Sequence, residues 1–190
     1  MVMVLGIFGS LNDAAFQTVK AIASPTLNFI MYYWAESFYV VLAALFLYLY
    51  FKKDKNLWPF ATAVVMLFVI DEILKALIRE PRPCSVQSLS WINSYNCESG
   101  YAFPSAHASV LTGLPLFLGN YKYVRIGYII WLVVVLAGRI YLGNHYLTDV
   151  IAGAAISIVV SFAIYKFRDR INIIADEIIG YFVKLIPVHK

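Results

Sequence analysis

Five apolar runs separated by short polar connections constrain this chain's fold more than any other feature. They cover about residues 33–51, 57–78, 105–119, 124–138 and 149–167, and the third is short and follows a proline directly. A backbone inside lipid must satisfy its own hydrogen bonds, so we expect each run to be a helix. The sequence therefore predicts an all-α bundle of about five transmembrane helices, within a single domain over residues 1–190.

The composition supports a membrane location. The chain is 62% hydrophobic and 14% charged, whereas soluble domains contain roughly 25% charged residues. Residues 1–30 lack the pattern of a cleaved signal, in which a short apolar stretch precedes a small-residue cleavage site. The net charge of +4 comes from basic residues that punctuate the apolar runs. We therefore expect a multi-pass protein of the cell membrane and no nucleic-acid partner.

Two segments outside the runs are amphipathic. Residues 10–24 open with capping residues and repeat apolar positions at helical spacing, and residues 170–186 have a similar character. Such segments suit helices that lie in the membrane interface. The predicted organisation is an amphipathic N-terminal segment (1–32), a transmembrane catalytic core (33–168) and an amphipathic tail (169–190).

Basic residues in the connections predict the orientation. Clusters follow the first, third and fifth runs, at Lys52, Lys53 and Lys55, at Lys122 and Arg125, and at Lys166, Arg168 and Arg170. The positive-inside rule places all three in the cytoplasm. The other two connections, 79–104 and 139–148, then face the extracytoplasmic side, and every motif described below lies in or beside them.

Both cysteines, Cys84 and Cys97, lie in the first of these outer connections. A disulfide between them closes a short loop and contributes about 3 kcal/mol in the chain-entropy model. The alternative is two unrelated buried thiols. Their spacing does not resemble a metal site, and we expect neither a metal nor a cofactor.

Three cations converge on the predicted outer face: Lys75, Arg82 and Arg139. Arginine binds phosphate oxygens in a forked geometry, and lysine adds a compact charge. Each one alone is equally explained as a cation that extends to the interface. Pro104-Ser105-Ala106-His107 begins the third run, and amides at a helix start can bind an anion, although a simple capped helix start fits this tetrapeptide too.

Two of the three histidines, His107 and His145, belong to these outer motifs. His145 and Asp149 are spaced i, i+4, so both lie on one helical face and the carboxylate can orient the imidazole. A membrane histidine often serves only as a hydrogen-bonding group between helices. Two of them beside a set of cations indicate a nucleophile and an acid–base partner.

Together these residues closely resemble the three-part signature of the type 2 phosphatidic acid phosphatase superfamily. The first part is Lys75, six residues, then Arg82-Pro83. The second is Pro104-Ser105-Ala106-His107. The third is Arg139, five residues, His145, three residues, Asp149. The resemblance covers about residues 30–168.

The resemblance implies metal-independent hydrolysis of a phosphate ester or anhydride. His145 matches the nucleophile that forms a phosphohistidine, Asp149 its orienting partner, and His107 the acid that protonates the leaving group. The phosphoryl oxygens would be held by Lys75, Arg82, Arg139, Ser105 and the Ala106 amide.

Two positions depart from the family pattern. Gly138 replaces a serine, which removes one hydroxyl contact, and Ala106 replaces a glycine but retains its amide.

Three acids near the same face also need a role. Asp71 and Glu72 are expected to orient Lys75 or Arg82, whereas Glu36 either lines the cavity or pairs with an arginine.

The compact plan resembles the polyprenyl diphosphate phosphatases of the superfamily. The leading hypothesis is hydrolysis of undecaprenyl or dolichyl diphosphate to the monophosphate, which recycles a glycan carrier. Phosphatidylglycerophosphate, phosphatidic acid and diacylglycerol pyrophosphate remain alternatives. A protein that binds or transports lipid phosphates without hydrolysing them is a further one, although binding alone requires no acid–nucleophile pair.

Overall fold

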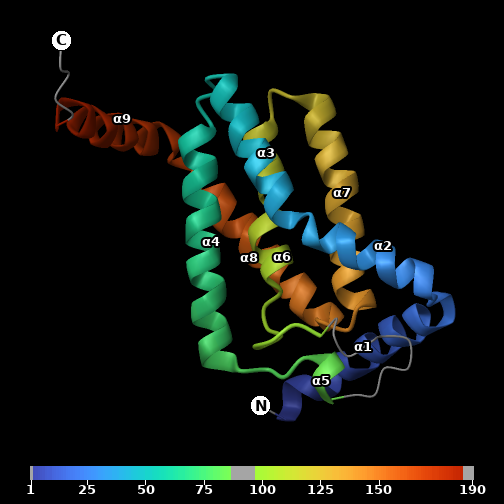
Figure 1. Ribbon diagram of the computed structural model, residues 1–190. Helices are drawn as coiled ribbons and strands as arrows, with labels where there is room; N and C mark the ends of the chain where they lie inside the picture. Colours follow the sequence, from blue (N-terminus) through green and yellow to red (C-terminus); the bar gives the residue numbers. More distant parts are fainter. Residues whose placement is uncertain (1, 87–96, 186–190) are drawn as a thin grey trace.

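A computed structural model of the chain describes residues 2–86 and 97–185, and over these residues its regular structure is entirely helical (Figure 1). The elements in chain order are α1 (Val2–Ile22), α2 (Pro25–Glu36), α3 (Phe38–Phe51), α4 (Leu57–Ile78), α5 (Pro83–Val86), α6 (Ala106–Leu111), the 3-10 helix η2 (Leu114–Leu118), α7 (Lys122–Tyr141), α8 (Leu147–Lys166) and α9 (Arg168–Leu185). The predicted all-α class is confirmed.

Three of the five predicted runs correspond to single helices. The run 57–78 coincides with α4, and the runs 124–138 and 149–167 correspond to α7 and α8. The N-terminal amphipathic segment is longer than predicted, because α1 already begins at Val2. The C-terminal one corresponds to α9, and its last predicted residue, 186, lies outside the described residues.

The predicted start of the first run, residue 33, is wrong. The helix begins at Pro25, where the Ser24 hydroxyl caps it by accepting the Leu27 amide at 3.2 Å. It then breaks at Ser37 and continues as α3. Proline at the first helical position has a suitable fixed φ and lacks the amide that would be unpaired there. The predicted boundary between residues 32 and 33 therefore falls inside α2.

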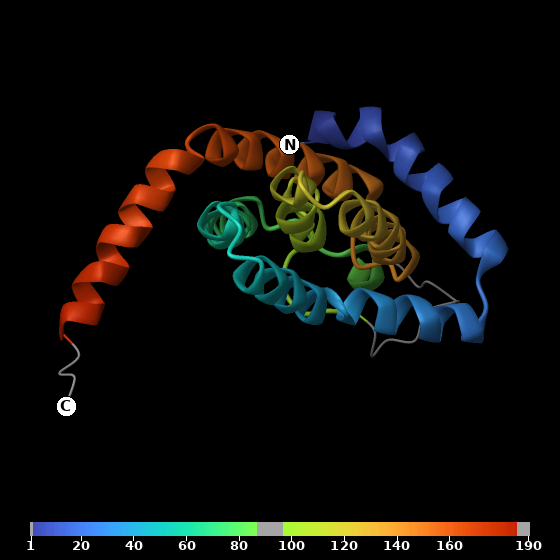
Figure 2. The same cartoon turned by 90° about the horizontal axis from the view of Figure 1, so that it is seen from above.

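The third run is not one helix, because α6 gives way to η2 at Gly113. A Cβ at Gly113 would lie 2.4 Å from the Ser157 carbonyl oxygen, so only glycine permits this approach to α8. The Gly113 amide donates to the Ser157 hydroxyl at 2.8 Å. Seen along the bundle in Figure 2, α6 lies at the centre, and α3, α4, α7 and α8 surround it.

The central position of α6 and η2 accounts for the core. Five of their apolar side chains are completely buried and pack against buried residues of α3, α4 and α7: Val110, Leu111, Leu114, Phe117 and Leu118. Burial of each such side chain contributes roughly 1.5–3 kcal/mol. A short buried helix thus provides the packing surface for the longer helices around it.

Within the described residues, three helical stretches are long and apolar enough to cross a membrane: Pro25–Phe51, Lys122–Tyr141 and Leu147–Lys166. The stretch Ala106–Leu118 is apolar but shorter, below the roughly 20 residues that a spanning helix needs. The predicted count of five spans remains a prediction.

The two ends of the bundle differ in their sequence. The α4 C-terminus, α5, the α7 C-terminus and the α8 N-terminus meet at the lower end in Figure 1, beside α1. The α3–α4 connection, the start of α7 and the junction of α8 with α9 lie at the opposite end. The motifs therefore share one end and the basic clusters the other, and α9 extends away from the bundle (Figure 2).

Candidate active site

The three sequence motifs meet around a cavity of about 230 Å³ at the lower end of the bundle. Five of the predicted site residues line it: Lys75, Arg82, Ala106, His107 and His145. The remaining lining residues come from the α2–α3 junction, from α4 and from the segment that begins at Cys97: Ala35, Glu36, Phe38, Tyr39, Phe68, Glu72 and Glu98.

Lys75 lies in the last turn of α4, which ends at Arg79 in the left-handed conformation (φ 53°). Its Nζ lies 2.7 Å from Oδ2 of the fully buried Asp71 and 3.5 Å from Oε1 of the exposed Glu72. The Ser109 hydroxyl donates to the other Asp71 oxygen at 2.7 Å. Asp71 thus fixes the ammonium of Lys75 at the cavity wall and connects it to α6.

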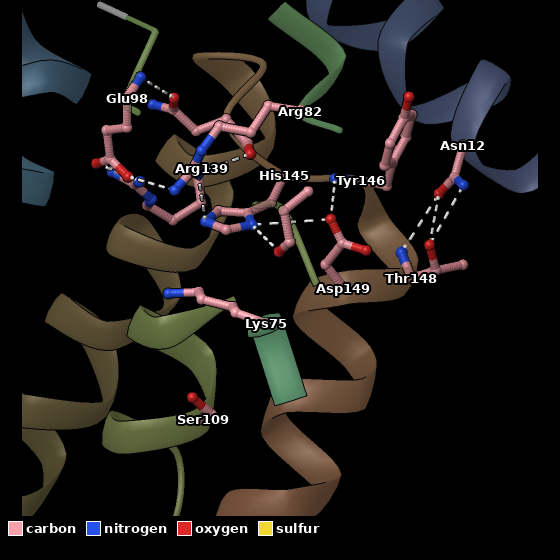
Figure 3. Close-up of polar contacts among 12 residues, drawn as sticks. Asn12, Lys75, Arg82, Glu98, Ser109, Arg139, His145, Tyr146, Thr148 and Asp149 are labelled. Atoms are coloured by element: carbon pink, nitrogen blue, oxygen red, sulfur yellow. Dashed lines mark hydrogen bonds and ion pairs between the residues drawn. The ribbon is translucent and has the colours of Figure 1, made fainter. Parts of the chain in front are cut away.

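Arg82 and Arg139 lie next to each other above His145, as Figure 3 shows. Both guanidinium groups are almost completely buried, and both form ion pairs with the Glu98 carboxylate. The Arg82 pair has an Nη2–Oε2 distance of 3.3 Å. Arg82 also donates to the carbonyls of Asn144 (3.0 Å) and Ser99 (3.2 Å). Glu98 therefore holds an anionic group between two buried cations.

His145 is 1% exposed, and each ring nitrogen has a partner (Figure 3). Nδ1 lies 2.7 Å from the Ala102 carbonyl oxygen, and Nε2 lies 3.2 Å from Arg82 Nη1. A carbonyl only accepts and a guanidinium only donates. Nδ1 therefore carries the proton, and the lone pair of Nε2 faces the cationic side of the cavity.

Asp149 is not the nearest partner of His145. Its Oδ2 lies 3.7 Å from Nδ1 and accepts the Tyr146 amide at 2.8 Å, an interaction that caps α8. Its side chain also lies close to that of Glu80. Asp149 thus stays within ion-pair distance of His145 while the Ala102 carbonyl orients the ring.

The turn between α7 and α8 brings Arg139 and His145 together. Gly143 has a φ of 65°, a conformation suited to glycine, and the chain returns so that the Arg139 carbonyl accepts the amides of Asn144 (3.2 Å) and His145 (3.3 Å). The Gly143 carbonyl accepts the Cys84 amide at 2.9 Å. This turn therefore connects the third motif to the first.

The second motif lies against α8. Ser105 precedes α6, its amide donates to the Asp149 carbonyl at 3.3 Å, and its buried hydroxyl has no hydrogen-bond partner within the described residues. A buried hydroxyl without a partner is energetically costly, so this one is available to a ligand. The ring of His107 donates to the Ala35 carbonyl and contacts the Phe38 ring, with centroids 4.6 Å apart.

A disulfide joins Cys84 to Cys97, directly beside Glu98.

Gly138, the first departure from the family pattern, packs against α2, and a Cβ there would lie 3.5 Å from the Met31 carbonyl oxygen. A side chain at residue 138 would therefore point toward α2, whereas the guanidinium of its neighbour Arg139 forms an ion pair with Glu98.

The electrostatics of the site favour a neutral imidazole and an ionised carboxylate. Burial lowers the pKa of His145 well below 6.5, and the charges of Arg139 and Arg82 lower it further. Burial alone would raise the pKa of Glu98, but the charges of the same two arginines outweigh it and the net shift is downward.

Sequence reasoning missed three groups: Glu98, Glu80 and the Ala102 carbonyl. Glu98 could have been noticed as an acid directly after Cys97, because a disulfide would bring it close to Cys84, two residues after Arg82. Glu80 lies between the two cations of the first motif. The Ala102 carbonyl has no side-chain signal, since any residue supplies the same oxygen.

Comparison with known proteins identifies the family. The model of the PAP2 superfamily matches residues 56–173. Sphingosine-1-phosphate phosphatase 1 of Rattus norvegicus is 33% identical over 117 residues. The match covers 57% of this chain but only 27% of the length of that phosphatase. Undecaprenyl-diphosphatase BcrC of Bacillus subtilis strain 168 is 21% identical to this chain. The match covers 88% of this chain and 86% of the length of BcrC.

The fold has a close counterpart among solved structures. A transmembrane PAP2-type phosphatidylglycerolphosphate phosphatase from Bacillus subtilis superposes with a TM-score of 0.67, covering 86% of this chain and 87% of its own at 22% identity. The family match spans more than half of the chain and includes all three motifs. This chain belongs to the PAP2 superfamily.

Proposed function

We propose that the protein is a metal-independent lipid phosphate phosphatase that acts through a phosphohistidine on His145. The observation that carries the proposal is the environment of this imidazole. Its Nδ1 proton is donated to a backbone carbonyl, which leaves the Nε2 lone pair directed at a cavity with Lys75, Arg82 and His107 in its wall. A neutral nucleophile in a cationic cavity suits attack on a phosphoryl group.

In the first step the phosphoryl group replaces the Glu98 carboxylate between Arg82 and Arg139. Nε2 attacks phosphorus and the bond to the leaving oxygen breaks. His107 enters this step as an imidazolium and transfers the proton of the ring nitrogen that does not contact Ala35 to that oxygen. The phosphorylated imidazole then carries a positive charge, which Asp149, 3.7 Å from Nδ1, can stabilise.

In the second step a water molecule attacks phosphorus and loses a proton to His107. The P–N bond breaks, inorganic phosphate leaves, and both histidines return to their starting states. Lys75, the Ser105 hydroxyl and the Ala106 amide would stabilise the charge that develops on the phosphoryl oxygens in both steps.

The proposed substrate is a polyprenyl diphosphate, of the undecaprenyl or dolichyl type, cleaved to the monophosphate. Its support is the coverage of both chains in the match to the undecaprenyl-diphosphatase. Phosphatidylglycerophosphate, phosphatidic acid and diacylglycerol pyrophosphate are alternative substrates of the same site. The proposed location is the extracytoplasmic face of the cell membrane, since the basic clusters lie at the other end of the bundle.

The test is phosphate release by purified protein, with chelator present, from undecaprenyl diphosphate and the three alternative lipids. We expect the diphosphate to be preferred and chelator to have no effect, and the His145→Ala variant should lose at least about 10³-fold in turnover. Strict dependence on a metal would overturn the mechanism, and preference for another lipid would overturn the substrate.

The same variant tests the non-catalytic alternative, in which the site only binds or transports lipid phosphates. His145→Ala retains Lys75, Arg82 and Arg139, so it should still bind the lipid while releasing no phosphate. No release by the wild-type protein from any lipid of the panel would favour the binding protein.

A further inference from the structure

The break between α2 and α3 lies directly beside His107. In a continuous helix the Ala35 carbonyl would accept an amide four residues later, but α2 ends at Glu36 and α3 begins at Phe38. Carbonyls at a helix end need other donors. The Trp34 carbonyl accepts the Ser37 hydroxyl at 2.6 Å, and the Ala35 carbonyl accepts the His107 ring.

A reciprocal pair of hydrogen bonds fixes this break to α7. The Trp131 indole N–H donates to the Ser37 hydroxyl oxygen at 2.9 Å, and the Trp34 indole N–H donates to the Trp131 carbonyl at 3.3 Å. The Ser37 hydroxyl therefore donates to the end of α2 and accepts from α7 at once. Helices α2 and α7 pack against each other along this contact.

Two groups that flank the break contact the His107 ring. Ala35, on the α2 side, supplies the carbonyl that accepts one ring N–H. Phe38, on the α3 side, is buried and packs on the ring with a centroid distance of 4.6 Å. A change in the angle between α2 and α3 would move both contacts together.

We propose that Ser37 and Trp131 are positioning residues for His107, and that their hydrogen bond holds the α2–α3 break in the geometry that aims the second ring nitrogen at the leaving group. The inference rests on the proposed function, in which His107 is the general acid. Neither residue lines the cavity, so both act through Ala35 and Phe38.

The experiment compares two soluble probes that differ in their need for an acid. Decyl phosphate releases a poor alkoxide leaving group, whereas p-nitrophenyl phosphate releases a good one that requires little protonation. A general acid contributes 10²–10⁴-fold to a rate. Since kcat/KM reports the steps up to release of the leaving group and not the later hydrolysis of the phosphoenzyme, partial misplacement of His107 in Ser37→Ala or Trp131→Phe should lower kcat/KM for decyl phosphate about tenfold and for p-nitrophenyl phosphate less than about twofold.

The controls separate positioning from general damage. Ser37→Thr keeps the hydroxyl and should restore most of the decyl phosphate rate. Trp58→Phe makes the same aromatic change in α4, where Trp58 packs against the core, and should leave the ratio of the two rates unchanged. His107→Gln sets the full size of the leaving-group effect.

Equal losses on both probes in Ser37→Ala and Trp131→Phe, or no loss in either variant, would overturn the inference. A His107→Gln variant that lowers kcat/KM equally for both probes would instead refute the acid role on which the inference rests. A wild-type protein that hydrolyses neither these probes nor any lipid would contradict the proposed function itself.

Discussion

At the scale of single residues, the site pairs one carboxylate with two buried arginines. Glu98 occupies the space between Arg82 and Arg139 where the phosphoryl group is proposed to bind. A carboxylate satisfies two buried guanidinium groups in the empty site. It must also give way to the substrate, so we expect Glu98 to compete with every anion that enters the cavity.

Neutralising this carboxylate should strengthen anion binding. In Glu98→Gln, we expect the inhibition constant of orthovanadate, a phosphate analogue, to fall about tenfold, because two buried arginines lose their competing partner. Glu72→Gln is the matched control, since Glu72 also lines the cavity but is exposed and lies 3.5 Å from Lys75. Unchanged or weaker inhibition of Glu98→Gln would contradict the competition.

His145 gives a pH prediction through its depressed pKa. Burial and the two arginines lower the pKa of this imidazole well below 6.5, so the nucleophile stays neutral in mildly acidic solution. The acidic limb of kcat/KM that reports His145 should therefore lie well below pH 6.5.

The same shift affects stability. The unfolded chain binds a proton at this histidine as pH falls through 6.5, whereas the folded chain does not, so folding stability should decrease as pH falls below that value. His145→Gln should have a smaller loss of Tm between pH 7.5 and 5.5. An equal loss in both proteins would show that His145 is not the group responsible.

The sequence predicts the charged residues of this site better than their partners. Lys75, Arg82, His107 and His145 line one cavity, because their spacing places them at one end of consecutive helices. The Ala102 carbonyl was not predictable, since the path of a loop depends on tertiary packing. The sequence predicts that Asp149 orients the His145 ring, whereas in the structure the Ala102 carbonyl lies closer to that ring. This difference has the same cause.

At the scale of elements, close packing of α8 against the start of α6 sets the second motif. A Cβ at Gly153 would lie 2.9 Å from the Ser105 carbonyl oxygen and 3.0 Å from the Ser109 amide nitrogen. Glycine thus permits α8 to approach the backbone that positions Ser105 and His107. The periodicity of the sequence predicts both segments as helical, but it contains no information about this distance.

Gly153→Ala should therefore separate α6 from α8. Overpacking of this kind costs typically 1–3 kcal/mol, and we expect a lower Tm together with a loss of about tenfold in kcat. Gly127→Ala is the control, because nothing lies within 4 Å of a Cβ there. A Gly153→Ala variant with unchanged Tm and kcat would show that the tight approach has no role.

The α2–α3 break shows a second limit of sequence reasoning at this scale. Apart from Glu36, the residues next to Ser37 are apolar or aromatic, and they predict one continuous run. The Ser37 hydroxyl at the break accepts a hydrogen bond from Trp131, which lies 94 residues away along the chain. A local pattern does not reveal a hydrogen bond between segments so distant in sequence.

At the scale of the whole molecule, the site and the basic clusters lie at opposite ends of the bundle (Figure 1). The order of motifs along the chain predicts this arrangement, since each motif ends or begins a helix on the same side. The family match over residues 56–173 includes all three motifs. The central claim is that this end of the bundle transfers a phosphoryl group to His145.

The most direct measurement is isolation of the phosphoenzyme. Purified protein is mixed with substrate labelled in its terminal phosphate, with chelator present, and denatured within milliseconds. The account predicts a label that is stable to base, labile to acid and located on His145, and that is absent from His145→Gln and accumulates in His107→Gln when p-nitrophenyl phosphate is the substrate. Rapid turnover without label on His145, or an equally labelled His145→Gln, would contradict it.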